Sequence, residues 1–367
     1  MPFSSSPYED FDRTMMLKCL ELAKKAQGKT SPNPMVGSIV VKDGKIIGEG
    51  FHPQAGQPHA EVFALQQAGS RAENATVYVN LEPCNHHGRT PPCTEALINA
   101  KVKKVVIGSI DPDSRVSGSG VKRLLEAGID VKIGVEEEAC LKLNEAFIHR
   151  VKYQRPFGIF KYAMTLDGKI ATTTGHSQWI TNPTSRNFVH HLRSICDAVI
   201  VGGNTVRQDN PQLTSHGVSD KNPTRVVMTK TFSLPFDRQL WDVKEANTLI
   251  FTLPQPDSLL KHHLLTQGVE IIETINLTPV FVMENLYQRG MNAVLWECGG
   301  NLASECIKLG MIQKVYAFIA PKIIGGEGFN PIGDLGINTM NEAIQLQDTQ
   351  ITQFDRDFLI QGYIMNN

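Results

Sequence analysis

Three residues in the first third of the chain have the types that bind zinc. His59, Cys84 and Cys93 supply one imidazole and two thiolates, three of the four ligands of a tetrahedral zinc ion. Three protein ligands leave the fourth position open for a water, which is typical of catalytic zinc. Glu61 follows His59 by two residues, too close to be a natural fourth ligand but well placed to exchange protons with that water. This set predicts a zinc-dependent deaminase in which Glu61 is the catalytic acid and base.

The elements around these residues explain how they are positioned. An apolar strand is expected at 76–80, just before Cys84, and helices are expected to begin at His59 and at Cys93. Helix N-termini present free N–H groups and the positive end of the helix dipole. We therefore expect both thiols to ionise easily and to bind metal as thiolates.

Two alternatives to a catalytic zinc remain open. One is a structural zinc whose fourth ligand is His52, His86 or His87, although none of these lies at an ordinary zinc-finger spacing. The other is a zinc-stabilised binding module, in which Glu61 has no chemical role. Prolines directly before Cys84 and Cys93, together with the preceding strand, favour the catalytic interpretation.

The overall charge indicates the class of substrate. The 367-residue chain has a formal net charge of −1, so it lacks the basic footprint that binds nucleic acid or an anionic membrane. A deaminase of nucleic-acid bases with an accessory domain is the competing interpretation, and it would need a basic groove. We therefore expect a small-molecule substrate, with no nucleic acid and no membrane partner.

Sorting signals and cysteine usage indicate the compartment. The first residues have no basic region followed by an apolar core, and no run approaches transmembrane length. The seven cysteines are an odd number, which favours a reducing compartment over a disulfide framework. We predict a soluble, cytoplasmic protein. The cysteines expected to be core thiols are Cys19, Cys140, Cys196, Cys298 and Cys306.

The length is sufficient for two domains, and a polar stretch at 149–156 separates two regions whose sequence patterns differ. We predict one domain at 1–150 and a second at 151–367. In the first, helices alternate with strands, which predicts a mixed sheet covered on both faces. Its other helices are expected at 12–25, at 121–127 and from 136, and its other strands at 36–41, 46–50, 104–110 and 130–134.

The second half is also predicted to be an α/β domain. A turn at 164–171 is expected to lead from a strand at 157–163 into another strand. Pro183 is expected to start a helix that Thr181 or Asn182 caps and that runs to 195. Further strands are expected at 198–202, 225–229, 248–252, 269–273, 293–296 and 314–320, with a closing antiparallel pair at 344–352 and 358–364.

Two glycine pairs are the visible candidates for ligand binding in this half. No Gly-x-Gly-x-x-Gly follows the first strand, so a Rossmann dinucleotide site is not supported. Strand-to-Gly-Gly junctions occur instead at 201–203 and 298–302, the second leading into a helix at 302–309. Such junctions let backbone N–H groups approach a phosphate, but they also occur as plain turns.

The residues between the zinc-binding cysteines resemble a known family. Segment 84–93, Cys-Asn-His-His-Gly-Arg-Thr-Pro-Pro-Cys, looks like the long insert of the pyrimidine deaminase of riboflavin biosynthesis, and the similarity extends to 31–37, 50–52 and 111–112. Cytidine and tRNA adenosine deaminases have only two residues at this insert. The resemblance implies a three-layer, cytidine-deaminase-like domain, often followed by a fused reductase.

The same resemblance implies roles for three further residues. Asn33 and His52 would line the base pocket, and Arg89 would meet a substrate phosphate, whose geometry suits a guanidinium. The family usually has Asp-Pro-Asn-Pro where this chain has Asp-Pro-Asp-Ser at 111–114. Asp113 and Ser114 depart from that pattern, and an amide donor is replaced by an acceptor, so we do not carry substrate contact over to Asp113.

The second half resembles the riboflavin-pathway reductase, a dihydrofolate-reductase-like α/β domain that uses NADPH. The motifs that carry this resemblance are 161–169, 177–180, 204–206, 209–213 and 297–300. The residues that would hold NADPH are Ala163, Trp179, Thr205, Asp209, Gly299, Gly300, Asn301, Leu302, Ala303, Ser304 and Glu305. Those that would hold the sugar phosphate are Ser177, Arg193, Leu213, His216 and Glu297. The family's usual Thr-Val-Arg is Thr-Ser-His at 214–216, so either His216 substitutes for the arginine or Arg207 compensates.

Together the two resemblances imply sequential steps on one pyrimidine ribotide. The first domain would use zinc to hydrolyse the ring amino group of 2,5-diamino-6-(5-phosphoribosylamino)pyrimidin-4-one. The second would transfer hydride from NADPH to C1 of the ring-opened ribose, giving 5-amino-6-(5-phosphoribitylamino)uracil. We expect a homo-oligomer, although the sequence does not set the number of subunits.

Overall fold

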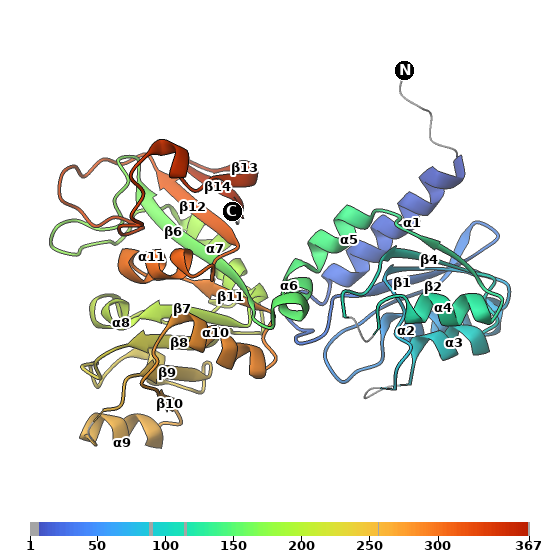
Figure 1. Ribbon diagram of the computed structural model, residues 1–367, viewed down its shortest axis with the longest axis horizontal. Coiled ribbons are helices and arrows are strands. Elements are labelled where there is room, and N and C mark those ends of the chain that lie inside the picture. The colour runs from blue at the N-terminus through green and yellow to red at the C-terminus, as the bar shows by residue number, and fades with distance from the viewer. Residues whose placement is uncertain (1–6, 88–90, 114–115, 256, 366–367) are drawn as a thin grey trace. The chain divides into compact units, whose positions relative to one another are not determined.

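The computed structural model describes residues 7–87, 91–113, 116–255 and 257–365. The chain forms two compact units, the first ending at Gln154 and the second beginning at Arg155 (Figure 1). This division falls inside the polar stretch at 149–156. Within the described ranges, no helix is long and apolar enough to cross a membrane.

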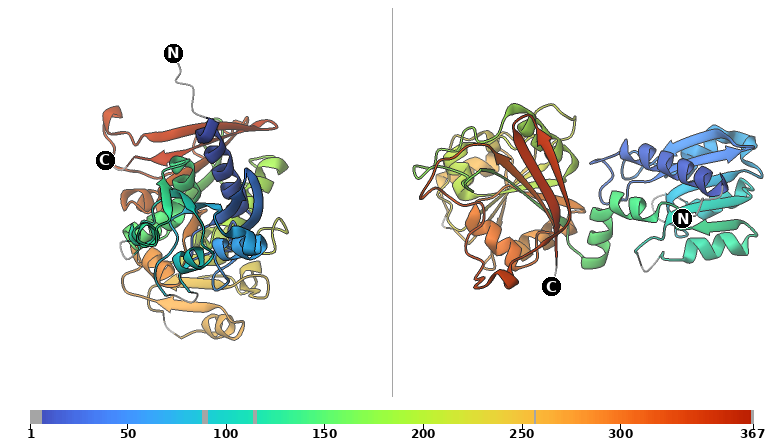
Figure 2. Two further views of the ribbon diagram at one scale, coloured as in Figure 1. Left: turned by 90° about the vertical axis from the view of Figure 1, so that its right-hand side faces the viewer. Right: turned by 90° about the horizontal axis from the view of Figure 1, so that it is seen from above.

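The first unit has three layers around a mixed five-stranded sheet (Figures 1 and 2). The sheet order is β2-β1-β3-β4-β5; β1 is antiparallel to both neighbours, whereas β3, β4 and β5 are parallel. Helices α1 and α5 cover one face, and α2, α3 and α4 cover the other. The bounds are α1 (Pro7–Lys24), β1 (Gly37–Lys42), β2 (Lys45–Phe51), α2 (Ala60–Ala68), β3 (Thr76–Leu81), α3 (Cys93–Asn99), β4 (Lys104–Ser109), α4 (Ser119–Glu126), β5 (Asp130–Ile133), α5 (Glu137–Leu143) and α6 (Glu145–Tyr153).

Two-residue alternation divides the core of this unit between the two faces of the sheet. In β1, Val40 packs with the α2 side, whereas Ile39 and Val41 pack with α1. In β3, Val77 and Tyr78 separate in the same way. Because both faces are apolar, each face buries a helix layer, which confirms the predicted cytidine-deaminase-like architecture.

The second unit is built on a nine-stranded sheet with the order β10-β9-β8-β7-β11-β6-β12-β14-β13. The strands from β10 to β12 in that order are parallel, and β14 and β13 close the sheet as an antiparallel pair. The strands are β6 (Phe157–Thr165), β7 (Ala198–Gly202), β8 (Thr224–Thr229), β9 (Thr248–Thr252), β10 (Glu270–Glu273), β11 (Ala293–Trp296), β12 (Lys314–Ala320), β13 (Leu346–Phe354) and β14 (Asp357–Ile364). The helices are α7 (Pro183–Ile195), α8 (Gly203–Asp209), α9 (Leu259–Thr266), α10 (Pro279–Gln288) and α11 (Gly300–Lys308).

Most predicted elements of this unit are present, with one clear error. The turn at 164–171 does not lead into a strand: only Ala171 makes an isolated bridge, with Phe329. The reason is that Thr165 closes a tight turn, accepting from the N–H of Lys169, and the chain leaves the sheet. Asn182 is the cap of α7, accepting from the N–H of Ser185. The five cysteines predicted to be core thiols are buried and free.

Candidate active sites in the two units

His59, Cys84 and Cys93 meet at one point of the first unit. Their ligand atoms all lie within 4.8 Å of one another. His59 Nδ1 lies 3.2 Å from Cys93 Sγ and 3.5 Å from Cys84 Sγ. In a tetrahedral zinc site, nitrogen and sulfur ligands are roughly 3.5 Å apart, so these three residues fit a zinc ion.

The start of α3 sets the ionisation of the two thiols. The pKa of Cys84 falls to about 4 because its sulfur accepts from the Cys93 thiol, from His59 and from the backbone N–H of Cys93, which together outweigh the effect of burial. The shared proton raises the pKa of Cys93 instead. The two sulfurs compete for one proton in this hydrogen-bonded pair, so Cys84 ionises more easily than Cys93. A cation bound between them removes that competition.

Glu61 reaches the same point from the first turn of α2. Its side chain is buried, and its Oε2 has no hydrogen-bond partner. Burial raises the pKa of this carboxyl group, which makes it easier to protonate than an ordinary glutamate. A buried carboxyl oxygen with an unused bonding position suits a group that accepts and returns a proton.

Asn33 and His52 form one wall of the cavity that contains these residues. His52 Nδ1 lies 3.1 Å from the carbonyl of Pro58, so it donates there, and Nε2 accepts from Asn33 Nδ2 at 3.0 Å. Burial lowers the pKa of His52, which keeps the ring neutral. Asn80 and Asn144 hold the loop that carries Asn33 in place, since both form hydrogen bonds with the backbone of Met35.

The alternative of a structural zinc loses one of its three candidate fourth ligands, His52, here. Both ring nitrogens of His52 are engaged, with Asn33 and with Pro58. The metal-binding group found among the described residues consists of His59, Cys84 and Cys93. A three-residue donor set with Glu61 beside it matches the open coordination of a catalytic zinc.

Another part of the cavity wall contains residues to which the sequence analysis assigned no role. The cavity, of about 610 Å³, is also lined by Glu82, Asp111, Asp113 and Arg150. Glu82 accepts backbone N–H groups at the start of α4 and from Asp111, which fixes this wall. Burial raises the pKa of Asp111 to about 6. Asp113, despite its departure from the family pattern, lies in the cavity wall.

Arg89, predicted to meet the substrate phosphate, lies outside the described part of the chain, as does Ser114, one of the two departures from the family pattern. Arg150 stands in the polar stretch that the sequence indicated only as a domain break. Its position in α6 is one that any surface arginine could occupy, so no local sequence signal identifies it as a site residue.

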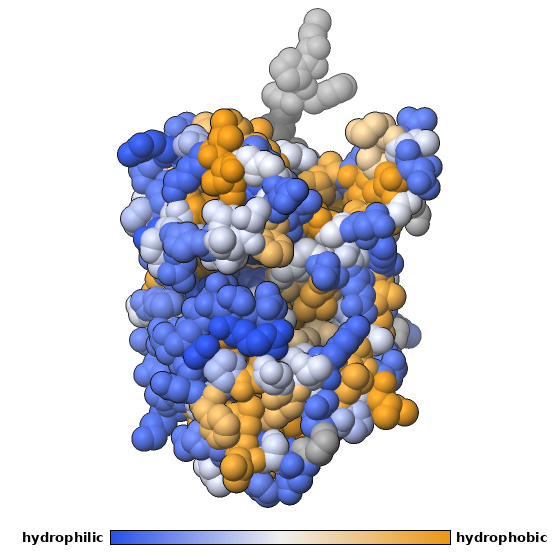
Figure 3. Space-filling model, turned by 90° about the vertical axis from the view of Figure 1, so that its left-hand side faces the viewer, coloured by the Kyte–Doolittle hydropathy of each residue, from blue (hydrophilic) through white to orange (hydrophobic). Residues whose placement is uncertain are grey.

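The second unit has a larger cleft, of about 1300 Å³, near the carboxyl ends of its central strands. The surrounding face has broad hydrophilic areas interrupted by apolar groups (Figure 3). Ser177 and Asp209 share a hydrogen bond in this cleft, and burial raises the pKa of Asp209. The predicted cofactor and substrate residues that line it are Ser177, Thr205, Asp209, Gly299, Gly300, Asn301, Leu302 and Glu305.

The second glycine pair shapes the floor of this cleft. A Cβ atom on Gly300 would lie 2.8 Å from the carbonyl oxygen of Asn330, so only glycine fits there. A Cβ on Gly299 would meet nothing within 4 Å, which leaves that position open to a ligand. Gly299 caps α11, whose first N–H groups face the ligand side of the junction. This arrangement fits a dinucleotide phosphate.

Four predicted cofactor residues do not line the cleft. Ala303 and Ser304 are buried in α11, where Ser304 donates to the carbonyl of Asn301. Ala163 lies in β6 and pairs with β12. Trp179 is 61% exposed, and the Arg186 guanidinium lies 4.5 Å from the centre of its ring.

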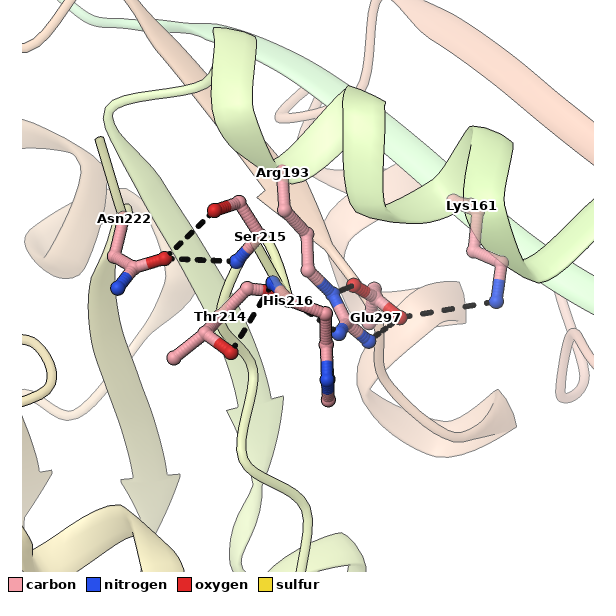
Figure 4. A network of polar contacts seen from close by, with 7 residues as sticks. All are labelled: Lys161, Arg193, Thr214, Ser215, His216, Asn222 and Glu297. Carbon is pink, nitrogen blue, oxygen red and sulfur yellow. Dashed lines mark hydrogen bonds and ion pairs between the residues drawn. The ribbon is translucent and has the colours of Figure 1, made fainter. Parts of the chain in front are cut away.

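Two of the remaining predicted substrate residues, Arg193 and Glu297, form a polar cluster that is not part of the cleft lining (Figure 4). Arg193 donates to both carboxylate oxygens of Glu297, at 2.6 and 3.0 Å, and Lys161 lies 3.7 Å from the same carboxylate. Burial alone would raise the pKa of Glu297, but Arg193 and Lys161 lower it to about 2. His216 lies beside this cluster, and Leu213 is buried. Lys161 was not identified as a site residue from the sequence, because its contact with Glu297 joins segments that are far apart in the sequence.

Taken together, a three-layer α/β unit with this donor set and buried glutamate defines the class of zinc-dependent deaminases. Comparisons with known proteins agree. Residues 9–109 match the cytidine and deoxycytidylate deaminase zinc-binding region, and residues 156–360 match the RibD C-terminal domain.

Full-length relatives extend this match over both units. The chain is 57% identical to the riboflavin biosynthesis protein RibD of Synechocystis sp., covering 97% of each chain. The structure of Acinetobacter baumannii RibD is similar with a TM-score of 0.88 at 36% identity, covering 98% of this chain and 100% of that one. The Thermotoga maritima diaminohydroxyphosphoribosylaminopyrimidine deaminase/5-amino-6-(5-phosphoribosylamino)uracil reductase has a TM-score of 0.87 at 38% identity, with 98% and 100% coverage. The chain belongs to the RibD family, the bifunctional deaminase–reductases of riboflavin biosynthesis.

Proposed function

We propose that the first unit hydrolyses the ring amino group of 2,5-diamino-6-(5-phosphoribosylamino)pyrimidin-4-one to the corresponding uracil and ammonia. The observation that carries this proposal is the buried, unpartnered Oε2 of Glu61 beside the donor set of His59, Cys84 and Cys93. Bound zinc supplies a water of lowered pKa that can act as the nucleophile at neutral pH.

The side chains of the first unit account for the proton transfers and the orientation of the base. Glu61 accepts the proton from the attacking water and passes it to the departing amine, and its raised pKa suits both directions of transfer. Asn33 would contact the pyrimidine edge, and the neutral His52 holds the Asn33 side chain in place through its Nε2. Arg89 is proposed to meet the phosphate, and Arg150 lines the same cavity.

We propose that the second unit then reduces the ring-opened ribose of this product with NADPH. The cofactor would be held by the predicted residues that line the cleft, with its phosphates at the Gly299–Gly300 junction. Asp209 and Ser177 would form the polar side of the cleft, where Asp209 helps to orient the reacting groups. Arg193, Leu213, His216 and Glu297 are proposed to hold the sugar phosphate.

The setting of the enzyme is also part of the proposal. We infer a cytoplasmic homo-oligomer that acts on small molecules and binds neither nucleic acid nor membranes. The net charge of −1 supports the absence of nucleic-acid and membrane partners, and the seven cysteines support a reducing compartment.

One experiment tests both activities and their order. The full chain, loaded with zinc, is given the enzymatically generated diaminopyrimidine ribotide and NADPH, and ammonia and NADPH are followed together. The proposal predicts that ammonia appears first and that NADPH is consumed afterwards. Ammonia without NADPH loss would contradict the proposed reduction, and neither signal would contradict both steps.

A further inference from the structure

A pair of histidines lies beside the Arg193–Glu297 cluster. His216 is proposed to hold the sugar phosphate, whereas His190 has no role so far. His190 in α7 and His216 in the loop after α8 stack with their ring centres 4.2 Å apart. The Nδ1 atom of His190 is buried and has no hydrogen-bond partner. A buried imidazole nitrogen without a partner has lost its contact with water and gained nothing in exchange, so it requires an explanation.

The loop that carries His216 is held in an uncommon conformation. Leu213 and His216 have positive φ angles of 56° and 49°, which side chains other than glycine rarely adopt. Asn222 fixes the loop by accepting from the N–H and the hydroxyl of Ser215, and Arg193 donates to the carbonyl of Thr214 (Figure 4). Such a conformation persists only where surrounding contacts enforce it, and here the contacts hold His216 against His190.

The charges around the pair favour an anion. The ionisable groups that face His190 are His216, Arg193, Glu297 and Lys161. Arg193 and Lys161 are basic, and the single carboxylate between them is already engaged by Arg193. Without an anion, a further positive charge is unfavourable. Burial, His216, Arg193 and Lys161 together lower the pKa of His190 to about 4, and burial and Arg193 lower the pKa of His216. Both rings are therefore neutral in the free protein at pH 7.

We propose that His190 and His216 form a proton-linked binding site for the phosphate group of the sugar substrate in the second unit. The inference rests on the proposed reductase function, because it takes the phosphorylated sugar as its ligand. A dianion placed against the two rings offsets the positive field of Arg193 and Lys161. The bound state then favours a protonated imidazole, so phosphate binding takes up a proton from solvent.

The test measures proton uptake when a phosphate ligand binds. Ribose 5-phosphate is titrated into the full chain by calorimetry at pH 7 and pH 8.5, in buffers with different ionisation enthalpies. The dependence of the observed heat on the buffer gives the number of protons taken up. We expect close to one proton per site at pH 7, and an affinity that falls about tenfold or more by pH 8.5, where phosphate itself is already a dianion.

Substitutions test whether the proton that is taken up binds to the pair of His190 and His216. His190→Phe and His216→Phe keep an aromatic ring but remove the nitrogens, so each should abolish the uptake and weaken binding about tenfold or more. His216→Arg supplies a fixed charge, so it should bind about equally at both pH values without uptake. His191→Phe is the matched control, since His191 is the exposed neighbour in α7 and should behave as the unmodified protein. Deaminase activity, which belongs to the first unit, and the unfolding midpoint report whether each variant is folded.

The outcomes separate this inference from the proposed function. Uptake that disappears in the His190→Phe and His216→Phe variants supports the pair, even if NADPH reduction is never observed. If the natural intermediate is reduced but ribose 5-phosphate binds the unmodified protein without proton uptake, the proton-linked site is overturned and the proposed reduction stands. Uptake that persists in both phenylalanine variants would also overturn it, because the proton would then belong to another group.

Discussion

The two sites of this chain differ in how their residues are brought together. In the first unit, three metal-binding atoms and one buried carboxyl group converge from the starts of α2 and α3 and from the loop after β3. In the second unit, the cleft is assembled from glycine junctions and loops at the ends of several strands, and the separate Arg193–Glu297 ion pair joins residues 104 positions apart. The first site depends on the chemistry of a few side chains, whereas the second depends on the shape of the backbone.

This difference implies that the two activities respond to different kinds of substitution. Removing one ligand atom should abolish deamination and leave the second unit intact. Changes in the second unit should instead weaken folding or cofactor binding by graded amounts. The predictions below test this contrast, beginning with the largest effect.

Cys84→Ala should have the largest effect. Its thiolate is the one most easily formed in the donor set, with a pKa of about 4. Without it only His59 and Cys93 remain, so we expect loss of zinc and a fall in ammonia release of about a thousandfold or more. Zinc content and ammonia release measure this directly. NADPH oxidation with the deaminated intermediate should be unchanged, and a parallel loss of both activities would contradict the contrast.

Arg193→Met should destabilise the second unit. Glu297 is buried and would keep its charge without its main partner, which typically costs about 3–5 kcal/mol. Urea unfolding should therefore show an earlier transition for the second unit. Arg186→Met, on the same helix but in contact with the exposed Trp179, is the control and should change the free energy of unfolding by less than about 1 kcal/mol. Equal effects of the two substitutions would refute the importance of the buried pair.

The same pair predicts how stability depends on pH. The folded pKa of Glu297 is about 2, below its ordinary value of 4.5. Its contribution is therefore complete above pH 4.5 and is lost as the pH falls towards 2, with a total of roughly 3 kcal/mol. Unfolding of the second unit between pH 5 and pH 2.5 should show this loss, and Glu297→Gln should flatten the curve. An unchanged slope in that variant would assign the acid sensitivity to other carboxyl groups.

Gly300→Ala should have the smallest effect. The added Cβ would lie 2.8 Å from the Asn330 carbonyl oxygen, so the loop must shift. We expect the KM for NADPH to rise about tenfold and the unfolding midpoint of the second unit to fall. Gly299→Ala is the informative comparison, because its Cβ meets nothing within 4 Å. It should raise the KM for NADPH while leaving the midpoint unchanged; a lowered midpoint would show that the open space serves folding instead.

The contrast also explains what the sequence could and could not predict. Histidine and cysteine ligands are few in kind and act at fixed distances, so His59, Cys84 and Cys93 could be read from residue types. Most strands could also be predicted, because they are buried runs of apolar residues. The strand expected after the turn at 164–171 failed because tight turn bonds around Thr165 override a short apolar pattern.

The pattern of the second site was less visible because it depends on contacts between distant segments. Nothing near Lys161 or His190 in the sequence indicates that each meets the Arg193–Glu297 cluster. Within the glycine junction, residue order alone did not separate the cleft-lining Asn301 from the buried Ala303. Only the direction of α11 from the sheet decides which side chains face the ligand.

The most direct test of the account is Glu61→Gln in the full chain. The substitution keeps the size of the side chain and the three metal-binding residues but removes the group that carries the proton. We predict unchanged zinc content, ammonia release lowered by about a hundredfold to ten-thousandfold, and normal NADPH oxidation with the deaminated intermediate. Ammonia release at the rate of the unmodified protein would contradict the account, because the buried glutamate would then have no part in the chemistry.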